Sequence, residues 1–322
     1  SMIKDRPDWC VSRQRMWGVP ITIFVSKKTG KPLIDKNVNN KILNVLKENG
    51  VESWFELPNE TFLTDGYLPD EYHKVSSILD VWFDSGSSHV YVLKNNKIKD
   101  KADLYLEGSD QHRGWFHSSL LQSCGTRGKA PFESILSHGF VVDGKGLKMS
   151  KSLGNVIAPE DILKKYGADI LRIWVAASNY AEDLRIDYSI LDQHSESYRK
   201  IRNTFRYLLG NINDKFEDVN FDEIDIESLP ELEKFLLNKI YILNQKFETC
   251  FNKYDFHNLY KELLSFCTVD LSAFYFDIRK DTLYCDPINS EKRKSCVTIL
   301  NVLLKSLLRW FAPILSFTTE EI

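Results

Sequence analysis

The sequence changes character at about Asp192, and this change limits the folds that the chain can adopt. Before it, strand-like and helix-like segments alternate. After it, apolar residues recur only at the three- and four-residue intervals of amphipathic helices. Four segments show this spacing: 198–212, 232–247, 256–266 and 297–311. We therefore expect an α/β region over residues 1–187, followed by an all-helical bundle over residues 188–322.

Within the α/β region, the most informative segment combines a strand, a glycine turn and a helix. The strand is predicted over 103–106, the turn is Glu107-Gly108-Ser109-Asp110, and the helix begins at Gln111. A second strand is predicted over 135–142. Units of this kind build parallel sheets, which bind ligands at the carboxyl ends of their strands.

Other segments of the α/β region have weaker patterns. The first 23 residues favour a short helix, and residues 26–78 read as an insertion with one helix over 41–49. A further helix is predicted over 161–174, where Gly167 fits a helix end.

Residues 148–152 read Lys-Met-Ser-Lys-Ser, and a Leu-Gly-Asn tail follows them. Glycines at positions 144, 146 and 154 give this lysine loop, residues 144–154, the freedom to open and close. Such a loop can deliver two ammonium charges to a polyphosphate. A bare pair of lysines would favour a solvated basic loop, but the complete string with its tail favours phosphate binding.

Composition narrows the classes of function. A net charge of −3 over 322 residues excludes a uniformly basic nucleic-acid binder and still allows a local basic stripe. The 6 cysteines are widely spaced, which argues against a zinc site and favours reduced thiols in a cytoplasm. No apolar run approaches the length of a membrane span. We expect no metal site in this chain, no membrane partner and a cytoplasmic location.

Three strings resemble the class I aminoacyl-tRNA synthetases, and within that class the bacterial isoleucyl-tRNA synthetases. They are Arg-Gln-Arg-Met-Trp-Gly at 13–18, Asp-Val-Trp-Phe-Asp-Ser-Gly at 80–86, and the run from Tyr105 to Phe116. The lysine loop is similar to the second signature of the whole class. The resemblance covers essentially the whole chain. It implies the second half of a Rossmann-like nucleotide-binding fold with an inserted α+β segment, followed by an anticodon-binding bundle.

The implied reaction is activation of isoleucine by ATP and transfer of the amino acid to tRNA(Ile). Lys148 and Lys151 would stabilise the departing pyrophosphate, with Mg²⁺ as helper and Lys151 in direct contact. Four further positions would surround the nucleotide: Gly108, Asp110 on the ribose, His138 and Val141. We expect the two strands to be parallel, with Glu107 and Lys148 facing one open crevice.

Four residues are implied in binding the aminoacyl-adenylate. Glu107 would contact the adenylate, and Gln111 would orient the polar groups of the substrate. Trp82 and Trp115 would form the walls around the isoleucine side chain. Structural alternatives remain open for four of the predicted residues: Glu107 and Asp110 suit turn formation or helix capping, and the two tryptophans suit core packing.

Some features of the family are absent from this sequence, which has no His-x-Gly-His string and no editing domain before residue 13. At the other end, Thr318 and Glu321 have the spacing of a capping box that opens a helix. We therefore expect an interior fragment that lacks the first half of the catalytic domain and is truncated within the bundle. By itself it would be inactive, and a zinc site is expected only in the missing C-terminal region of the parent.

The bundle offers a candidate RNA-binding stripe. Arg199, Arg202 and Arg206 share one helix face and suit the phosphates of a tRNA stem, although a solvated face is the commoner outcome. Two other functions stay open: a non-catalytic tRNA-binding module and a valyl-type synthetase. The expected partners are tRNA(Ile), isoleucine and ATP, and the expected state is a monomer.

Overall fold

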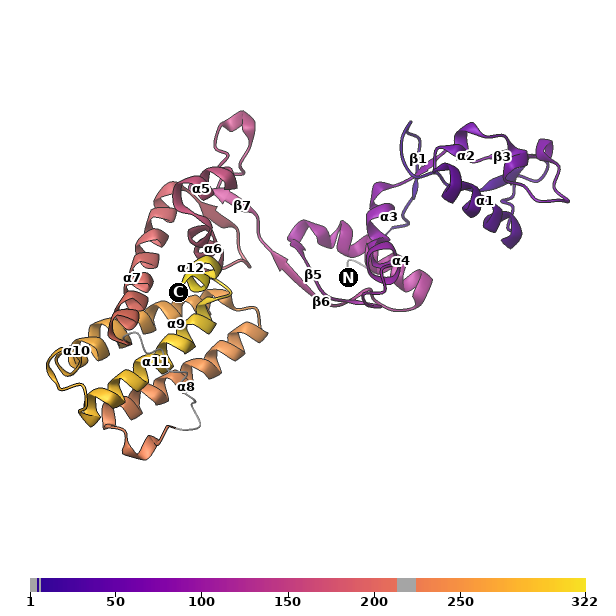
Figure 1. The fold of residues 1–322 in the computed structure, drawn as a ribbon. Coiled ribbons are helices and arrows are strands. Elements are labelled where there is room, and N and C mark those ends of the chain that lie inside the picture. The colour runs from indigo at the N-terminus through magenta and orange to yellow at the C-terminus, as the bar shows by residue number, and fades with distance from the viewer. Residues whose placement is uncertain (1–4, 6, 213–223) are drawn as a thin grey trace. The chain divides into compact units, whose positions relative to one another are not determined.

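The computed structural model describes residues 5, 7–212 and 224–322. Its contacts divide the chain into two compact units, Ser1–His138 and Gly139–Ile322 (Figure 1). Within the described part of the chain, no helix is both long and apolar enough to cross a membrane.

The described residues of the first unit form short strands in three pairs and four α-helices. Its strands are β1 (Ser12–Arg13), β2 (Phe24–Ser26), β3 (Tyr72–Lys74), β4 (Ile78–Leu79), β5 (Ala102–Gly108) and β6 (Phe132–His138). Its helices are α1 (Lys36–Asn49), α2 (Ser53–Glu56), α3 (Val81–Gly86) and α4 (Trp115–Arg127), and a π-helical segment spans His89–Lys94. The pairs β1–β4 and β2–β3 are antiparallel, and β5–β6 is parallel.

The unit β5–α4–β6 confirms the predicted parallel strands. Tyr105 of β5 pairs with Ile135 of β6, and Gly108 lies opposite His138 at the carboxyl ends. The ring of Tyr105 stacks on Trp115 of α4 with centroids 4.1 Å apart, so the helix packs directly against the sheet. A strand–helix–strand connection of this kind aligns the two carboxyl ends at one edge.

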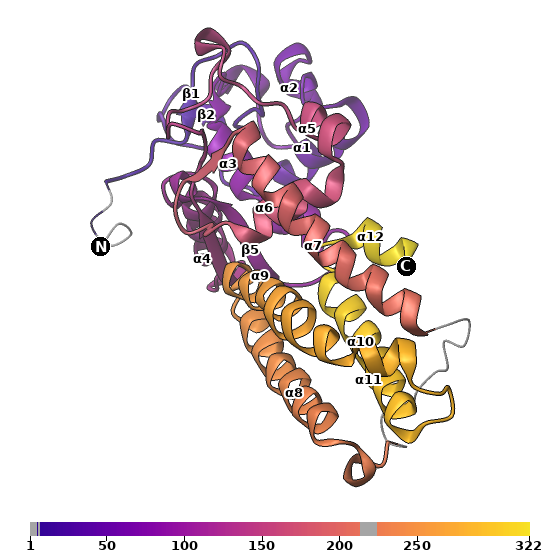
Figure 2. The same cartoon turned by 90° about the vertical axis from the view of Figure 1, so that its left-hand side faces the viewer.

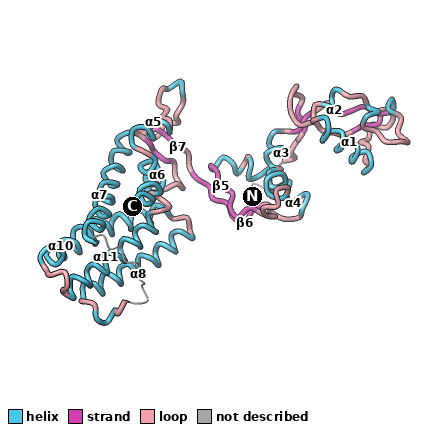
Figure 3. Tube along the Cα trace, in the orientation of Figure 1, coloured by secondary structure: helices cyan, strands magenta, loops and turns pink. Residues whose placement is uncertain are grey.

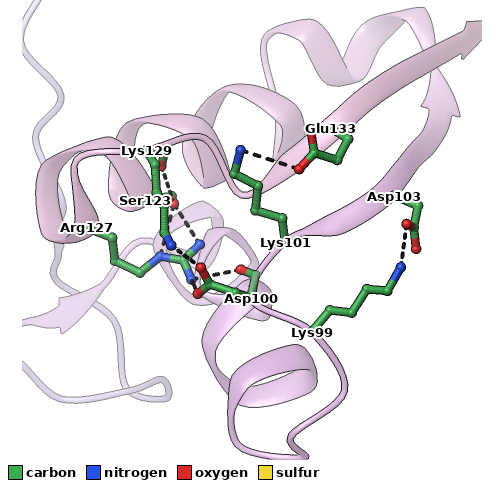
Figure 4. A network of polar contacts seen from close by, with 8 residues as sticks. All are labelled: Lys99, Asp100, Lys101, Asp103, Ser123, Arg127, Lys129 and Glu133. Atoms are coloured by element: carbon green, nitrogen blue, oxygen red, sulfur yellow. Dashed lines mark hydrogen bonds and ion pairs between the residues drawn. The ribbon is translucent and has the colours of Figure 1, made fainter.

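Polar contacts join the opposite end of this unit, where β5 and β6 begin (Figure 4). The carboxylate of Asp100 forms ion pairs with Arg127, at 3.3 Å, and with Lys129. Arg127 also donates to the hydroxyl of Ser123 at 2.8 Å, and that hydroxyl donates to the carbonyl of Lys129 at 2.7 Å. The end of α4 and the start of each strand are therefore tied to one another.

The predicted insertion has a small core of its own, formed by Phe24, Val38, Ile42, Trp54, Phe62 and Leu63. Its helix α1 begins at Lys36, five residues before the predicted start, because the carboxylate of Asp35 caps the first turn. The helix predicted in the first 23 residues was wrong for the described part of that stretch. There β1 pairs with β4, and Arg13 forms an ion pair with Asp80.

The second unit is mainly helical (Figure 3). Its strands β7 (Val141–Asp143) and β8 (Leu184–Ile186) are parallel. Its helices are α5 (Pro159–Tyr166), α6 (Ala168–Ala177), α7 (Tyr188–Ile212), α8 (Glu231–Asn252), α9 (Phe256–Ser265), α10 (Phe276–Cys285), α11 (Glu291–Phe311) and α12 (Ser316–Glu321), with a π-helical segment over Phe266–Tyr275. One continuous core joins them, and α11 contacts both α7 and α8 (Figure 2). All four predicted helical segments of the bundle are confirmed.

The strand predicted over 135–142 is two strands with a break at Gly139. A Cβ at Gly139 would lie 2.2 Å from the carbonyl oxygen of Glu182, so only glycine fits. Beyond the break, β7 pairs with β8, and residues 139–187 pack with the helices. The boundary between the compact units therefore lies at 138/139. The predicted boundary between the catalytic region and the bundle, at 187/188, is a functional division and stays a prediction.

The capping-box prediction at the end of the chain was wrong. Helix α12 begins at Ser316, so Thr318 lies inside it. The carboxylate of Asp169 in α6 accepts hydrogen bonds from the backbone N–H of Thr318 at 2.8 Å and from its hydroxyl at 2.6 Å. A residue far away in the sequence therefore takes the place of the local cap.

A buried ion pair crosses the apolar core of the bundle. Glu233 of α8 is fully buried and accepts two hydrogen bonds from Arg279 of α10, at 2.7 and 2.5 Å. The hydroxyl of Tyr275 donates to the same carboxylate at 3.1 Å. Burial and this neighbouring carboxylate raise the pKa of Tyr275, and the ion pair fixes α8 relative to α10.

Candidate active site

The turn after β5 carries the polar residues of the first candidate region. Glu107 and Asp110 are exposed, and Gly108 is buried between them. The amide oxygen of Gln111 accepts the backbone N–H of Trp115 at 2.9 Å, and its amide nitrogen donates to Asp110 at 3.1 Å. The helix therefore begins at Trp115 and not at Gln111, because Gln111 caps it from a preceding 3₁₀ turn. The amide of Gln111 is held in place at the strand's carboxyl end.

Trp115 and Trp82 differ in how they are held. The indole N–H of Trp115 donates to the carbonyl of Ser85 at 3.1 Å and to the hydroxyl of Ser88 at 3.0 Å. Together with the stacking on Tyr105, these bonds fix the ring of Trp115 in place. The side chain of Trp82 is 42% exposed. Its ring reaches Gly114, where a Cβ would lie only 3.0 Å from it.

A hollow of about 470 Å³ opens beside Trp82. Asp80 is buried at its edge, where it accepts the backbone N–H of Trp82 at 2.9 Å and pairs with Arg13. Burial, and secondarily the charge of Asp80, raises the pKa of Asp84. Trp17 also lines the hollow. No role was predicted for Arg13, Trp17, Asp80 or Asp84, although the aromatic and charged residues of strings 13–18 and 80–86 are a signal that could have indicated one.

The backbone of the lysine loop is fixed by two polar side chains. Asp143, at the end of β7, accepts the backbone N–H groups of Lys145 at 3.0 Å and Leu147 at 2.8 Å. The amide nitrogen of Asn155 donates to Asp143 at 2.9 Å, and the amide oxygen of Asn155 accepts the backbone N–H of Ser150 at 2.9 Å. The hydrogen bond from Asn155, followed by those from the backbone, lowers the pKa of Asp143.

Lys148 and Lys151, two of the three lysines in the loop, point their charges to solvent. Lys148 and Lys151 are both exposed, and neither forms an ion pair with a described residue. Gly154, with φ +65°, ends the short helical turn Lys151–Leu153 in a conformation that favours glycine. Gly144 leaves room for Asp187, whose carboxylate would lie 2.0 Å from a Cβ there. The loop is thus a fixed backbone on which the amines of Lys148 and Lys151 are free of ion pairs with described residues.

The predicted site residues are distributed over both compact units. Trp82, Glu107, Gly108, Asp110, Gln111, Trp115 and His138 belong to the first unit, and Val141, Lys148 and Lys151 belong to the second. A common crevice for Glu107 and Lys148 would need residues of both units, and it stays a prediction. Within residues 5, 7–212 and 224–322, no group of three or more His, Cys, Asp or Glu side chains is arranged to hold a metal ion.

A parallel strand–turn–helix unit and a loop with two free lysines agree with a family of known proteins. The sequence model of the tRNA synthetases class I (I, L, M and V) matches residues 1–187. This chain belongs to the class I tRNA synthetases. The model of the anticodon-binding domain of tRNA ligase matches residues 233–322, so neither model covers residues 188–232.

Individual relatives agree with the class I assignment. Over its full length the chain is 67% identical to the isoleucine–tRNA ligase of Pelagibacter ubique and 49% identical to that of Zymomonas mobilis. It spans only 36% and 34% of their lengths, about a third.

Two solved structures share the class I fold. One is the agnB2 LeuRS of Agrobacterium radiobacter K84 in a complex with tRNA and LeuAMS, with a TM-score of 0.69 and 18% identity over 97% of this chain and 39% of that one. The other is methionyl-tRNA synthetase of Mycobacterium tuberculosis in complex with methionyl-adenylate, with a TM-score of 0.61 and 14% identity over 93% of this chain and 69% of that one.

Proposed function

We propose that the protein containing these residues is an isoleucine–tRNA ligase. It activates isoleucine with ATP and transfers the product to tRNA(Ile). The observation that carries this proposal is the 67% identity, over the whole chain, to a relative named as such a ligase. The fixed turn after β5 and the free lysines of the loop supply suitable chemistry.

In the first step, a carboxylate oxygen of isoleucine attacks the α-phosphorus of ATP. The bond to the oxygen that bridges to the β-phosphorus breaks, and pyrophosphate leaves with the bonding electrons. Negative charge grows on the leaving group, where the amines of Lys148 and Lys151 stabilise it. Mg²⁺ enters as part of the MgATP substrate and shares that task. In the second step, a hydroxyl at the 3′ end of the tRNA attacks the carbonyl carbon, and AMP leaves.

Substrate contacts are proposed at the carboxyl ends of β5 and β6. Glu107 binds the adenylate, and Asp110 binds the ribose. Gly108 lets the backbone approach the nucleotide, and His138 lies opposite it in the sheet. Val141 flanks the nucleotide from the second unit.

Amino-acid contacts are proposed for Gln111, Trp82 and Trp115. Gln111 orients the polar groups of the amino acid, since its amide is already fixed by Trp115 and Asp110. Trp82 and Trp115 bound the apolar side chain, and the exposed ring of Trp82 is the more accessible of the two walls.

The test is amino-acid-dependent exchange of pyrophosphate into ATP by the protein that contains these residues. Isoleucine should support the fastest exchange. Discrimination of isoleucine from valine is the standard example of how little one methylene contributes, about 10–200-fold in an apolar pocket. Exchange with valine or leucine at least as fast as with isoleucine would refute the proposed specificity.

We also propose that the 322 residues alone bind tRNA without activating isoleucine. They span about a third of the relatives' length, and the described sheet beside Glu107 has two strands. The purified chain should show no isoleucine-dependent exchange above a Lys151→Ala background. Exchange above that background would contradict this second proposal and leave the first intact.

A further inference from the structure

Asp80 joins two distant segments of the first unit. It is 5% exposed and stands between β4 and α3, the helix that carries Trp82. One oxygen of its carboxylate accepts the backbone N–H of Trp82 at 2.9 Å, and the other oxygen forms the ion pair with Arg13. That second oxygen also accepts the indole N–H of Trp9 at 3.4 Å. The carboxylate therefore connects residues 9–13 to the first turn of α3.

Arg13 is fixed through both of its terminal nitrogens. One of them donates to Asp80, and the other donates to the backbone carbonyls of Cys10 at 2.6 Å and Ser12 at 2.8 Å. The backbone N–H of Asp80 donates in turn to the carbonyl of Val11 at 2.8 Å. A guanidinium with three acceptors has little freedom to turn, so it holds the carboxylate of Asp80 in one place.

The ring of Trp82 depends on this arrangement for its position. No described residue hydrogen-bonds the indole N–H of Trp82, whereas that of Trp115 donates to two groups. Packing and the backbone at the start of α3 therefore place the ring, and Asp80 caps that backbone. The ring reaches Gly114, where a Cβ would lie 3.0 Å from it and 2.5 Å from the amide oxygen of Gln111. Two of the proposed amino-acid contacts thus meet over Gly114.

Loss of the ion pair would act on Trp82 through the carboxylate. Without Arg13, the carboxylate of Asp80 would keep only neutral donors, the N–H groups of Trp82 and Trp9. A buried charge without its partner is strongly unfavourable, so the carboxylate would turn towards water and draw the start of α3 with it. The exposed ring of Trp82 would then move relative to Gln111.

We propose that Arg13 and Asp80 are positioning residues for isoleucine. They touch no substrate, and they hold the ring of Trp82 at the separation from Gln111 that fits the amino acid. Binding groups need to be held within about 0.5 Å of their productive positions, and the residues behind them do so. The inference rests on the proposed function, because it concerns the same amino-acid site, and it adds two residues to that site.

The test is isoleucine-dependent exchange of pyrophosphate into ATP by the protein that contains these residues. Arg13→Ala should raise the KM for isoleucine about three- to fivefold, less than Trp82→Ala, because the ring is displaced and not removed. The kcat and the KM for ATP should change by less than about twofold, since only the binding of isoleucine is weakened. Arg13→Lys keeps a charge for Asp80 without the planar fork, and its KM should lie between those of Arg13→Ala and the original protein.

A second variant and a double variant separate positioning from stability. Asp80→Asn keeps an N-cap for α3 and removes the ion pair, so it should raise the KM for isoleucine as Arg13→Ala does. In Trp82→Ala, adding Arg13→Ala should raise the KM no further, because no ring is left to position. A fall in kcat with both KM values unchanged would assign only a stabilising role to Arg13 and overturn the proposal. So would an equal rise in KM from Arg13→Ala in the original protein and in Trp82→Ala.

Arg15→Ala is the matched control. Arg15 is an exposed arginine of the same string, lines the same hollow and forms no ion pair with a described residue. Its loss removes an equal charge without touching Asp80, so the KM for isoleucine should stay unchanged. A rise as large as that in Arg13→Ala would assign the effect to the charge of the hollow and overturn the proposal.

The outcomes separate this inference from the proposed function. If isoleucine supports the fastest exchange and Arg13→Ala leaves its KM unchanged, the positioning role fails and the ligase proposal stands. If another amino acid supports the fastest exchange and Arg13→Ala raises the KM for that amino acid, the proposed specificity fails and the link from Arg13 to Trp82 stands. If no amino acid supports exchange, both fail.

Discussion

The turn after β5 and the lysine loop are held in opposite ways. In the turn, the side chains that would meet a substrate are themselves fixed: Gln111 is bonded at both ends of its amide, and Trp115 donates to two groups. In the lysine loop, Asp143 and Asn155 fix the backbone, and the amines of Lys148 and Lys151 remain free. Fixed groups suit the recognition of shape, and mobile charges suit a leaving group whose charge changes during the reaction.

The largest effect on the rate of activation should come from removing the free charge of Lys151. In the protein containing these residues, Lys151→Ala should slow isoleucine-dependent pyrophosphate exchange by about 100-fold or more, with little change in isoleucine binding. Lys145→Ala is the matched control, because Lys145 is an exposed lysine of the same loop. An equal loss in both variants would mean that the loop acts through its total charge, and no loss in either would remove Lys151 from the reaction.

The two tryptophans test the fixed region. Trp82→Ala should raise the KM for isoleucine about tenfold, the loss expected for about 1.4 kcal/mol of apolar contact, with a small effect on stability. Trp115→Ala should lower the free energy of unfolding by about 3 kcal/mol, because it removes ring stacking and two hydrogen bonds. Steady-state kinetics and urea unfolding measure the two quantities. If both variants unfold equally easily, the distinction between the tryptophans is mistaken.

A smaller effect on the exchange rate is expected from Asn155, which holds the backbone of the lysine loop. Asn155→Ala removes hydrogen bonds to Asp143 and Ser150, each with a net contribution of about 1 kcal/mol. Exchange should slow about three- to fivefold, which is less than for Lys151→Ala, because both charges remain. Leu153→Ala, at an exposed apolar position of the same loop, is the control. A loss as large as that of Lys151→Ala would show that backbone geometry dominates.

The smallest expected change is a shift in the pKa of Asp143. The hydrogen bond from Asn155 holds the pKa of Asp143 below its ordinary value of 3.8. Because the folded-state pKa is lowered, the contribution of this carboxylate to stability is present at neutral pH and is lost as the pH falls through that folded value. In Asn155→Ala, the midpoint should rise towards 3.8, as followed by carboxyl ¹³C NMR. An unchanged midpoint would assign the shift to the backbone N–H groups alone.

Local signals in the sequence predicted local structure. The strand before Glu107, the helix end at Gly167 and the amphipathic helices of the bundle follow from patterns a few residues long. The break at Gly139 was missed because its cause is the carbonyl of Glu182, more than forty residues away. The cap of α12 was misassigned for the same kind of reason, since Asp169 supplies it.

The candidate site shows the same limit. Sequence strings led to Glu107, Gln111 and the two lysines because these residues stand out in short motifs. They could not reveal that Gln111 caps α4, or that Asn155 joins the two ends of the lysine loop through Asp143 and also holds the backbone of Ser150. Such roles depend on which residues are close in three dimensions. The spacing of apolar residues along the sequence does not indicate them.

The buried pair of Glu233 and Arg279 has a consequence for how this chain can change over generations. Losing one partner leaves the other charge without compensation in an apolar core, at about 3–5 kcal/mol, whereas replacing both with apolar residues of similar volume is often neutral. A single substitution at either position is therefore strongly destabilising. An apolar pair can be reached only if both residues are replaced together. Across descendants of this sequence, the two positions should be inherited together as a single character, even though 46 positions separate them in the chain.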